Sequence, residues 1–330
     1  MWPAPQVAIN ACASLQGGKV RGMGEALKSL QVVGVRYRGG TLAEGDERSL
    51  DRFAASGVYE RAGVPVDIVE PRLPEAWRGG GESEALGLLG GAIADVVAGA
   101  RCEGKGVLLT GGNCTHCSGV LGGLQDAHGA AARIGLVWFD AHGDFNTPST
   151  TLTGYLGGMP VAVCAGLAYP DWREGSHMAV PLPTDRILLV DMRNLDPAEE
   201  QLIRATDAVV AAVAPGFPGQ ELAAAVGDLA ERCDMIYLHI DSDILDESYV
   251  PSHGTREPNG PDMAQVRAAI ETVMATGKVV AYAVVSVYGR GEGSDITVAS
   301  GIELVGAGLE AWRQHGLPGL TPVASCQSAS

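Results

Sequence analysis

The chain has 330 residues and combines 39 Asp and Glu with 23 Lys and Arg, which gives a formal net charge of -16. This negative balance argues against a nucleic acid or an anionic membrane surface as partner, because both bind basic faces. With 46% hydrophobic and 19% charged residues, the composition argues against a disordered chain and allows a sizeable core.

Short apolar segments alternate with helical patterns along the chain. Strands are predicted at 32–35, 64–69, 106–109, 134–139, 186–190, 208–213, 235–240 and 279–285. Helices are predicted at 47–61, 82–102, 118–128, 197–204, 220–232, 262–275 and 296–313. This alternation predicts the α/β class, as a single three-layer α/β/α domain around a central, mostly parallel sheet of about eight strands. We expect the domain at residues 31–316, an N-terminal extension packed on its edge at 1–30, and a C-terminal tail at 317–330.

The chain start, the hydropathy and the cysteines together predict a cytoplasmic protein without a membrane anchor. No basic segment followed by an apolar run opens the sequence, so we expect no signal peptide. The longest weakly polar stretch, 85–100, is interrupted by Asp95 and is too short to cross a bilayer as a helix. Seven cysteines, an odd number without secretory context, indicate reduced thiols.

Three predicted strands are followed by the side chains that most often bind metals. The segments 111–117, 140–146 and 241–243 come directly after the strands that end at Leu109, Phe139 and Ile240. Ligands of parallel α/β sheets bind outside the carboxyl ends of the strands. We therefore expect these three segments to meet at one edge of the sheet.

Within these segments the residues at alternate positions favour a metal site. Asp140, His142 and Asp144 are two residues apart, as are Asp241 and Asp243, so each set can converge on one point at the end of its strand. Four carboxylates in one crevice repel one another, and divalent cations offset that repulsion. A single Asp-x-Asp pair is more often a turn or helix cap, but both motifs together with an imidazole favour metal binding.

The same segments resemble the ureohydrolase family, which includes arginases and agmatinases. The similarity rests on GGNCT at 111–115, DAHGD at 140–144 and HIDSDILD at 239–246, and it extends from about residue 32 to about residue 313. It implies an arginase-like α/β domain with a binuclear manganese centre, whose bridging hydroxide attacks a guanidinium carbon. Members of the family are commonly homo-oligomers, often trimers or hexamers.

The resemblance also implies metal ligands. Asp140 and Asp241 would bridge the two metals, Asp144 would bind one metal, and His142 and Asp243 would bind the other. Asp144 would also accept a hydrogen bond from the bridging hydroxide and carry its proton, which makes it a catalytic residue.

Cys114 stands where the family has a histidine ligand of the first metal. A thiolate adds a negative charge that imidazole lacks, so it weakens the metals as Lewis acids. Sulfur also moves the metal preference from Mn²⁺ toward Zn²⁺, Fe²⁺ or Co²⁺. His116 and Cys117 are rivals for the ligand role, although no second cysteine pair at zinc spacing accompanies Cys114 and Cys117.

The expected substrate-binding residues follow the second motif and the last strand. Asn146, Thr151 and Thr153 correspond to residues with which arginases bind the amino acid, and they keep amide or hydroxyl groups suited to a carboxylate. Tyr155 stands where arginases have an Asn. Ser286 replaces the family glutamate that pairs with the guanidinium, and a hydroxyl cannot neutralise that cation.

A second family residue is missing at Gly157, where relatives have a histidine that transfers protons. His253 follows the third motif, and we expect it to replace this proton donor as a catalytic residue; the alternative is a histidine on a surface loop. Unless an acid such as Glu257 or Glu292 approaches the substrate, the pocket favours a less basic group than arginine or agmatine. Such groups include N-hydroxyguanidino, ureido, formimidoyl and amide groups.

We therefore predict a metal-dependent hydrolase with two divalent ions per chain that cleaves a C–N bond in a small guanidino- or amidino-type amino-acid derivative. Two alternatives stay open: a hydrolase of an uncharged ureido, formimidoyl or amide substrate, and a catalytically silent relative that only binds metal. Nucleotide binding by the glycines at 289–293 is less favoured, because their spacing differs from Gly-x-Gly-x-x-Gly. A cysteine or serine hydrolase is disfavoured too, since no Gly-x-Ser-x-Gly segment is present.

Overall fold

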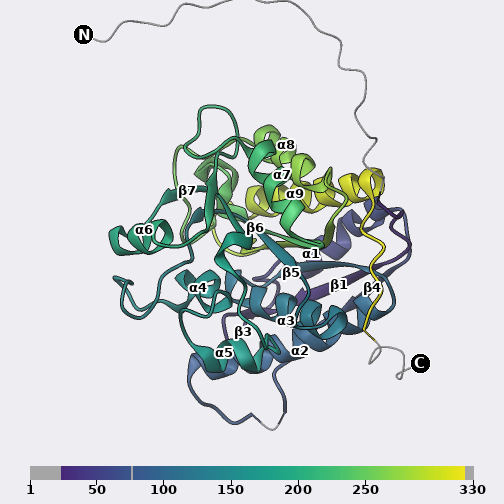
Figure 1. Cartoon of the computed structure of the whole chain (residues 1–330), viewed down its shortest axis with the longest axis horizontal. Helices are drawn as coiled ribbons and strands as arrows, with labels where there is room; N and C mark the ends of the chain where they lie inside the picture. The colour runs from purple at the N-terminus through teal and green to yellow at the C-terminus, as the bar shows by residue number, and fades with distance from the viewer. Residues whose placement is uncertain (1–23, 76, 324–330) are drawn as a thin grey trace, which may run out of the picture.

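The computed structural model describes residues 24–75 and 77–323, so most of the predicted extension and half of the predicted tail lie outside the described residues. Its centre is a parallel sheet of eight strands in the order β4-β1-β5-β10-β9-β6-β7-β8. Figure 1 shows this sheet between the helices. Helices cover both faces of this sheet. The predicted single α/β/α domain with an eight-stranded parallel sheet is therefore confirmed.

All eight predicted strands are present. They are β1 (Leu30–Val35), β4 (Val66–Val69), β5 (Gly106–Gly111), β6 (Ile134–His142), β7 (Ile187–Asn194), β8 (Val209–Ala211), β9 (Met235–Asp241) and β10 (Val279–Val285). Every residue of β1, β5, β9 and β10 is buried, because helices on both faces exclude water from a parallel sheet. The short antiparallel pair β2 (Tyr37–Arg38) and β3 (Thr41–Leu42) was not predicted.

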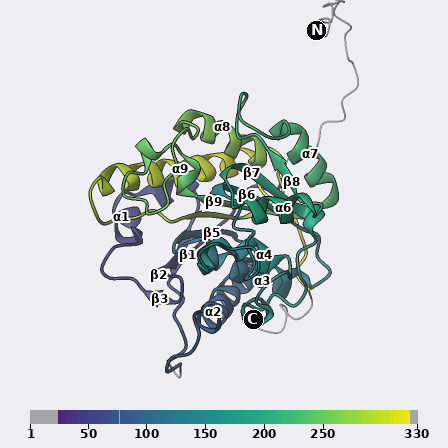
Figure 2. The same ribbon diagram turned by 90° about the vertical axis from the view of Figure 1, so that its left-hand side faces the viewer.

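The helices form one layer on each face of the sheet (Figure 2). On one face lie α1 (Leu50–Ala55), α7 (Leu222–Arg232), α8 (Met263–Met274) and α9 (Ser294–His315). The other face carries α2 (Glu82–Cys102), α3 (Cys117–His128), α4 (Pro160–Cys164) and α6 (Pro197–Arg204), and α5 (Pro170–Gly175) packs on α2. The apolar cores on the two sides of the sheet fix the position of each strand end.

The predicted helix at 47–61 is wrong as one continuous element. The structure has α1 followed by a short 3-10 helix, Val58–Ala62. Gly57 between them has a φ of 69°, a left-handed conformation that interrupts an α-helix and that glycine adopts without steric cost.

Helix α2 contains the stretch 85–100 and, with 21 residues, is long and apolar enough to cross a membrane, so the expectation that this segment is too short is wrong. However, 61% of its most apolar window is buried inside the protein. It packs against α3 and α5 as a core helix. At the ends of the described chain, the backbone of Glu25 pairs with that of Leu317, with N···O distances of 2.8 and 2.9 Å. Residues of the predicted extension and of the predicted tail therefore contact each other.

Four of the cysteines, Cys114, Cys117, Cys164 and Cys233, are buried free thiols. Cys102 is disulfide-bonded. The expectation that all seven cysteines are reduced is therefore wrong for Cys102.

Candidate metal centre

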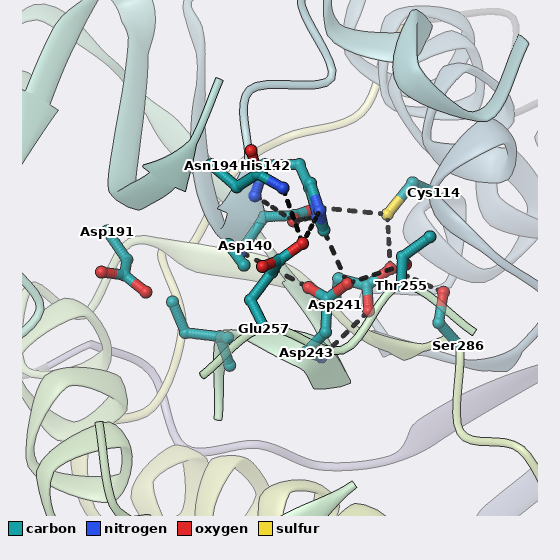
Figure 3. A network of polar contacts seen from close by, with 12 residues as sticks. Cys114, Asp140, His142, Asp191, Asn194, Asp241, Asp243, Thr255, Glu257 and Ser286 are labelled. Atoms are coloured by element: carbon teal, nitrogen blue, oxygen red, sulfur yellow. Dashed lines mark hydrogen bonds and ion pairs between the residues drawn. The ribbon is translucent and has the colours of Figure 1, made fainter. Parts of the chain in front are cut away.

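The polar residues after the strands meet at the carboxyl edge of four neighbouring strands, β5, β10, β9 and β6. Asp140 and His142 are in the last residues of β6, and Asp241 is the last residue of β9. Cys114 opens the 3-10 turn that follows β5. Figure 3 shows these side chains and that of Asp243 pointing toward one another. Parallel strands that end at the same edge bring together residues more than a hundred positions apart.

The turn that carries Cys114 depends on two glycines and a histidine. Gly111 and Gly112 have φ values of 74° and 61°, and a Cβ at Gly111 would lie 2.6 Å from the carbonyl oxygen of Val35. His116 Nδ1 lies 3.1 Å from the backbone nitrogen of Asn113, and its Nε2 lies 3.1 Å from the carbonyl oxygen of Gly39. His116 therefore holds the loop and has no nitrogen left for a metal.

The ligand atoms form three overlapping groups in the described part of the chain. Each group has atoms within 4.8 Å of one another: Cys114, Asp140 and Asp241; Asp140, His142 and Asp243; Asp241, Asp243 and His253. Three aspartates are shared between the groups, so the cluster is continuous and can hold more than one ion. Cys114 Sγ lies 2.9 Å from Asp241 Oδ2 and 3.6 Å from Asp140 Oδ2.

The rival Cys117 lies elsewhere. Its sulfur is fully buried and lies 3.6 Å from that of Cys164. Neither Cys117 nor His116 is in a possible ligand group of the described residues, so the structure gives no support to a zinc site made from the Cys114-x-x-Cys117 pair.

Asp144 lines the same cavity but lies outside these three groups. Its φ is 48°, a left-handed conformation that aspartate tolerates better than most residues. Burial, and then the charge of Asp140, raise the pKa of Asp144.

The electrostatics of the cluster fit a divalent cation. Burial, and then the charge of Asp243, raise the pKa of Asp140, while burial and Asp241 raise the pKa of the Cys114 thiol. Burial alone would lower the pKa of His142, but the Asp140 and Asp243 carboxylates beside it raise it instead. So many buried acids are stable as anions only beside compensating positive charge. The residues present therefore suit a metal site.

His253 lies inside the cluster. Its Nε2 is 3.1 Å from Asp241 Oδ1, its Nδ1 is 3.6 Å from Asp243 Oδ2, and it is 2% exposed. Its ring contacts the edge of Tyr288, with centroids 4.9 Å apart. The alternative of a histidine on a surface loop is therefore wrong.

The loop after β9 is held by Arg193 from the end of β7. Its guanidinium donates to the carbonyl oxygens of Asp243, Leu245 and Glu257 at 2.7, 3.0 and 3.2 Å, and it pairs with the buried carboxylate of Asp191. This cation fixes the backbone from which Asp243 reaches the cluster.

A cavity of about 250 Å³ opens above the cluster. Its lining includes all five predicted substrate-binding residues, Asn146, Thr151, Thr153, Tyr155 and Ser286. It also includes residues that the sequence reading did not assign: Asn113, Asn194, Asp196, Glu199, Thr255 and Tyr288. Asn194, Asp196 and Glu199 follow the predicted strand at 186–190, so the carboxyl end of that strand was the available signal.

The positions of the two missing family residues are occupied by other groups. Ser286 has a φ of 58°, and its hydroxyl donates to Asp241 Oδ2 at 2.6 Å. A Cβ at Gly157 would collide with the ring of Tyr155. Tyr155 therefore covers the place where a side chain at 157 would begin.

The two acids considered as substitutes differ in position. Glu257 Oε1 lies 2.6 Å from Asn194 Nδ2 and 3.4 Å from His142 Nε2 (Figure 3). Glu292 is exposed and does not line the cavity. Of these two acids, Glu257 is therefore the one near the site. Its contact with His142 Nε2 suits it to orient that imidazole.

A comparison with protein families identifies the chain. The model of the Arginase family matches residues 81–309. The chain belongs to the Arginase family. The resemblance to the ureohydrolases is thereby confirmed.

Among relatives of this Arginase-family chain, the N(omega)-hydroxy-L-arginine amidinohydrolase of Streptomyces lavendulae is 39% identical over 140 residues, which cover 42% of this chain and 46% of that protein. An arginase from Neurospora crassa is 30% identical over 59% of this chain and 56% of its own length. The chain thus spans about half the length of these two relatives. An arginase from Bacillus caldovelox is 26% identical over 74% of this chain and 86% of its own length.

Solved structures share the fold. An arginase from Entamoeba histolytica has a TM-score of 0.74 at 20% identity, covering 86% of this chain and 99% of that one. The formimidoylglutamase of Bacillus subtilis has a TM-score of 0.64 at 12% identity, covering 89% and 90%. At these identities the likeness supports the arginase-like fold and leaves the substrate to the residues of the cavity.

Proposed function

We propose that the protein is a metal-dependent hydrolase that cleaves a C–N bond of a small guanidino- or amidino-type amino-acid derivative. The observation that carries the proposal is the set of three overlapping ligand groups on the floor of the 250 Å³ cavity. Membership of the Arginase family supports the same reaction class.

The cluster would hold two divalent ions. Cys114, Asp140, Asp144 and Asp241 would bind one ion, and Asp140, His142, Asp241 and Asp243 would bind the other. Manganese follows from the family, and the sulfur ligand makes zinc, iron or cobalt alternatives. When bound, such ions lower the pKa of water and so supply a nucleophile at neutral pH.

The chain's own residues would handle protons and hold the substrate. The buried carboxylate of Asp144 lines the cavity and can accept a proton there. His253, buried beside Asp241, is our candidate donor to the leaving nitrogen. Asn146, Thr151 and Thr153 offer amide and hydroxyl groups for a carboxylate, and Asp196 places an acid in the same lining for an ammonium group.

A weakly basic N-hydroxyguanidino group suits the cavity better than a guanidinium. Ser286 offers no negative charge, its hydroxyl is bonded to Asp241, and Glu257 is bonded to Asn194. With Asp196 assigned to the ammonium group, a buried guanidinium would lack a carboxylate of its own, which is costly. The name of the Streptomyces lavendulae relative, N(omega)-hydroxy-L-arginine amidinohydrolase, supports this substrate class.

The test is an activity screen of metal-loaded protein against arginine, N-hydroxyarginine, agmatine, guanidinobutyrate, and ureido, formimidoyl and amide analogues. We expect a kcat/KM for N-hydroxyarginine at least about tenfold above that for arginine, which corresponds to about 1.4 kcal/mol in transition-state binding. Asp140→Asn is the inactive control. Turnover only of ureido, formimidoyl or amide analogues would favour the uncharged-substrate alternative, and no turnover with metals bound would favour the silent relative.

We further propose a cytoplasmic homo-oligomer, a trimer or hexamer, that acts on a small molecule and binds neither nucleic acid nor membrane. Light scattering coupled to gel filtration tests the oligomer. A monomer at micromolar concentration would contradict it.

A further inference from the structure

Behind Cys114 lies a chain of buried polar groups that the proposed reaction does not use. His239 Nε2 is 3.4 Å from Cys114 Sγ, and His239 Nδ1 is 2.7 Å from the hydroxyl of Tyr237. Tyr237 and His239 alternate along β9 with Asp241, so all three point to one face of the sheet. Both Tyr237 and His239 are 0% exposed.

The imidazole of His239 is also held in its plane. It stacks on Trp138, the residue opposite it on β6, with ring centroids 3.9 Å apart and an angle of 3° between the planes. The indole and the phenol together leave the ring one orientation, in which Nε2 points at the sulfur.

We propose that His239 is a positioning residue that donates its Nε2 proton to the Cys114 sulfur when that sulfur binds a metal as a thiolate, and that Tyr237 fixes the required tautomer. The inference rests on the proposed metal function.

The positions of the protons support this assignment. The Tyr237 hydroxyl has one proton to donate. Within residues 24–75 and 77–323, the hydrogen-bond partner of this hydroxyl is His239 Nδ1. Donation from the phenol to Nδ1 leaves the proton of a neutral imidazole on Nε2. The opposite tautomer would aim a lone pair at the negative sulfur.

A ligand role for His239 itself fits the geometry less well. No possible ligand group of the described residues includes this histidine, while its two ring nitrogens face Tyr237 and Cys114. It therefore reaches the metal site through the sulfur.

The hydrogen bond compensates for the unusual ligand. A thiolate carries a charge that imidazole lacks, and an N–H donor draws electron density away from the sulfur. On metal binding, Cys114 releases one proton to water, whereas His239 keeps its single proton and stays neutral. The metals thus experience a ligand closer in donor strength to the imidazole found in relatives.

Cobalt loading tests the proposal, because a thiolate bound to Co²⁺ gives a charge-transfer absorption whose energy depends on the sulfur's hydrogen bonds. Wild-type protein should show this band and Cys114→Ser should lack it. In His239→Leu, which has no donor, the band should move to longer wavelength. Co²⁺ should bind about 10- to 100-fold more weakly, because the buried thiolate is harder to form and to orient without its hydrogen bond. His239→Gln places an amide N–H near the Nε2 position and should restore the wild-type band.

Tyr237→Phe keeps His239 and removes only the group that fixes its tautomer, so it tests the proposal even if His239→Leu fails to fold. Its band should move in the same direction as that of His239→Leu. The matched control is Tyr282→Phe, which removes another fully buried hydroxyl, bonded to the Leu304 carbonyl at 2.7 Å, and should leave the band unchanged.

The outcomes distinguish the proposed metal site from the proposed positioning role of His239. If the wild type binds Co²⁺ without a band that depends on Cys114, the sulfur is not a ligand and the proposed metal site is wrong in that part. If the band is present but neither His239→Leu nor Tyr237→Phe moves it, only the positioning role is overturned. A histidine with a purely structural role would change stability and leave the band in place.

Discussion

Cys114 adds the one sulfur to ligand groups that otherwise consist of aspartates and histidines in the described part of the chain. Its sulfur lies 2.9 Å from one aspartate and within 4 Å of a second, so a thiol there without a cation must keep its proton. The same sulfur as a thiolate needs positive charge on one side and, in our proposal, an N–H donor on the other.

Replacement of Cys114 by alanine should remove at least one of two divalent ions per chain, because the ion beside Asp140 and Asp241 would lose its sulfur ligand. Elemental analysis of purified protein measures this ratio. Cys117→Ala removes a fully buried thiol three residues away, outside the ligand groups, and should leave the metal content unchanged. Full occupancy in Cys114→Ala would show that the thiolate is not a ligand.

His253→Asn distinguishes a proton donor from a ligand, since His253 lies in one of the possible ligand groups. For a donor we expect kcat to fall by about 10²- to 10⁴-fold with both metals retained. Loss of a metal in the same variant would instead assign His253 to the ligand set. Metal analysis and kinetics on one preparation are therefore both needed.

Residue spacing predicted part of this site. Asp140, His142, Asp241 and Asp243 could be found because each pair follows an apolar strand at two-residue spacing. His239 lies within an apolar strand, where a buried residue usually belongs to the core, so its contact with Cys114 could not be seen before the strands were placed. Asn194 and Asp196 also lie two residues apart after a strand, but an amide beside a single acid is a weaker metal signal than the paired aspartates, so they were not assigned.

At the scale of elements, α2 and α3 pack closely because glycines replace larger residues where the helices cross. A Cβ at Gly123 of α3 would lie 2.6 Å from the Ala94 carbonyl oxygen and 2.6 Å from the Val97 Cβ on α2. Gly99 of α2 faces open space, with nothing within 4 Å of its Cβ position.

These two glycines give a matched pair of variants. Gly123→Ala should lower the free energy of unfolding by about 1–3 kcal/mol, because the added methyl group overpacks the contact. Gly99→Ala should raise it by about 0.5–1 kcal/mol, since alanine restricts the unfolded chain more than glycine does. Denaturant titration measures both, and equal destabilisation by the two changes would contradict the packing argument.

Strands were easier to predict than the helices between them. Continuous apolar runs such as β9 and β10 are typical of strands buried on both faces. The five- and six-residue helices α4 and α5 lacked a periodic pattern long enough to recognise. The break at Gly57 depends on one backbone angle, which hydropathy does not encode.

For the molecule as a whole, the cluster makes stability depend on metal. Ligand binding to the folded state alone stabilises it by about 2.7 kcal/mol when the free ligand is at 100 times its Kd. Removal of metal with a chelator should therefore lower the Tm by several degrees, and added divalent ions should restore it. Asp140→Asn protein, with a weakened site, should respond less. An unchanged Tm in calorimetry would contradict metal binding to the folded state.

The strand order also determines when during synthesis the site can form. Cys114 follows β5 and Asp140 ends β6, yet β10 and β9 lie between these two strands in the sheet. The ribosome makes β5 and β6 well before β9 and β10. The space between β5 and β6 in the sheet can therefore be filled only after residue 285 has been made. The full ligand set therefore cannot assemble before both β9 and β10 have been synthesised, so metal loading has to follow the synthesis of these two strands.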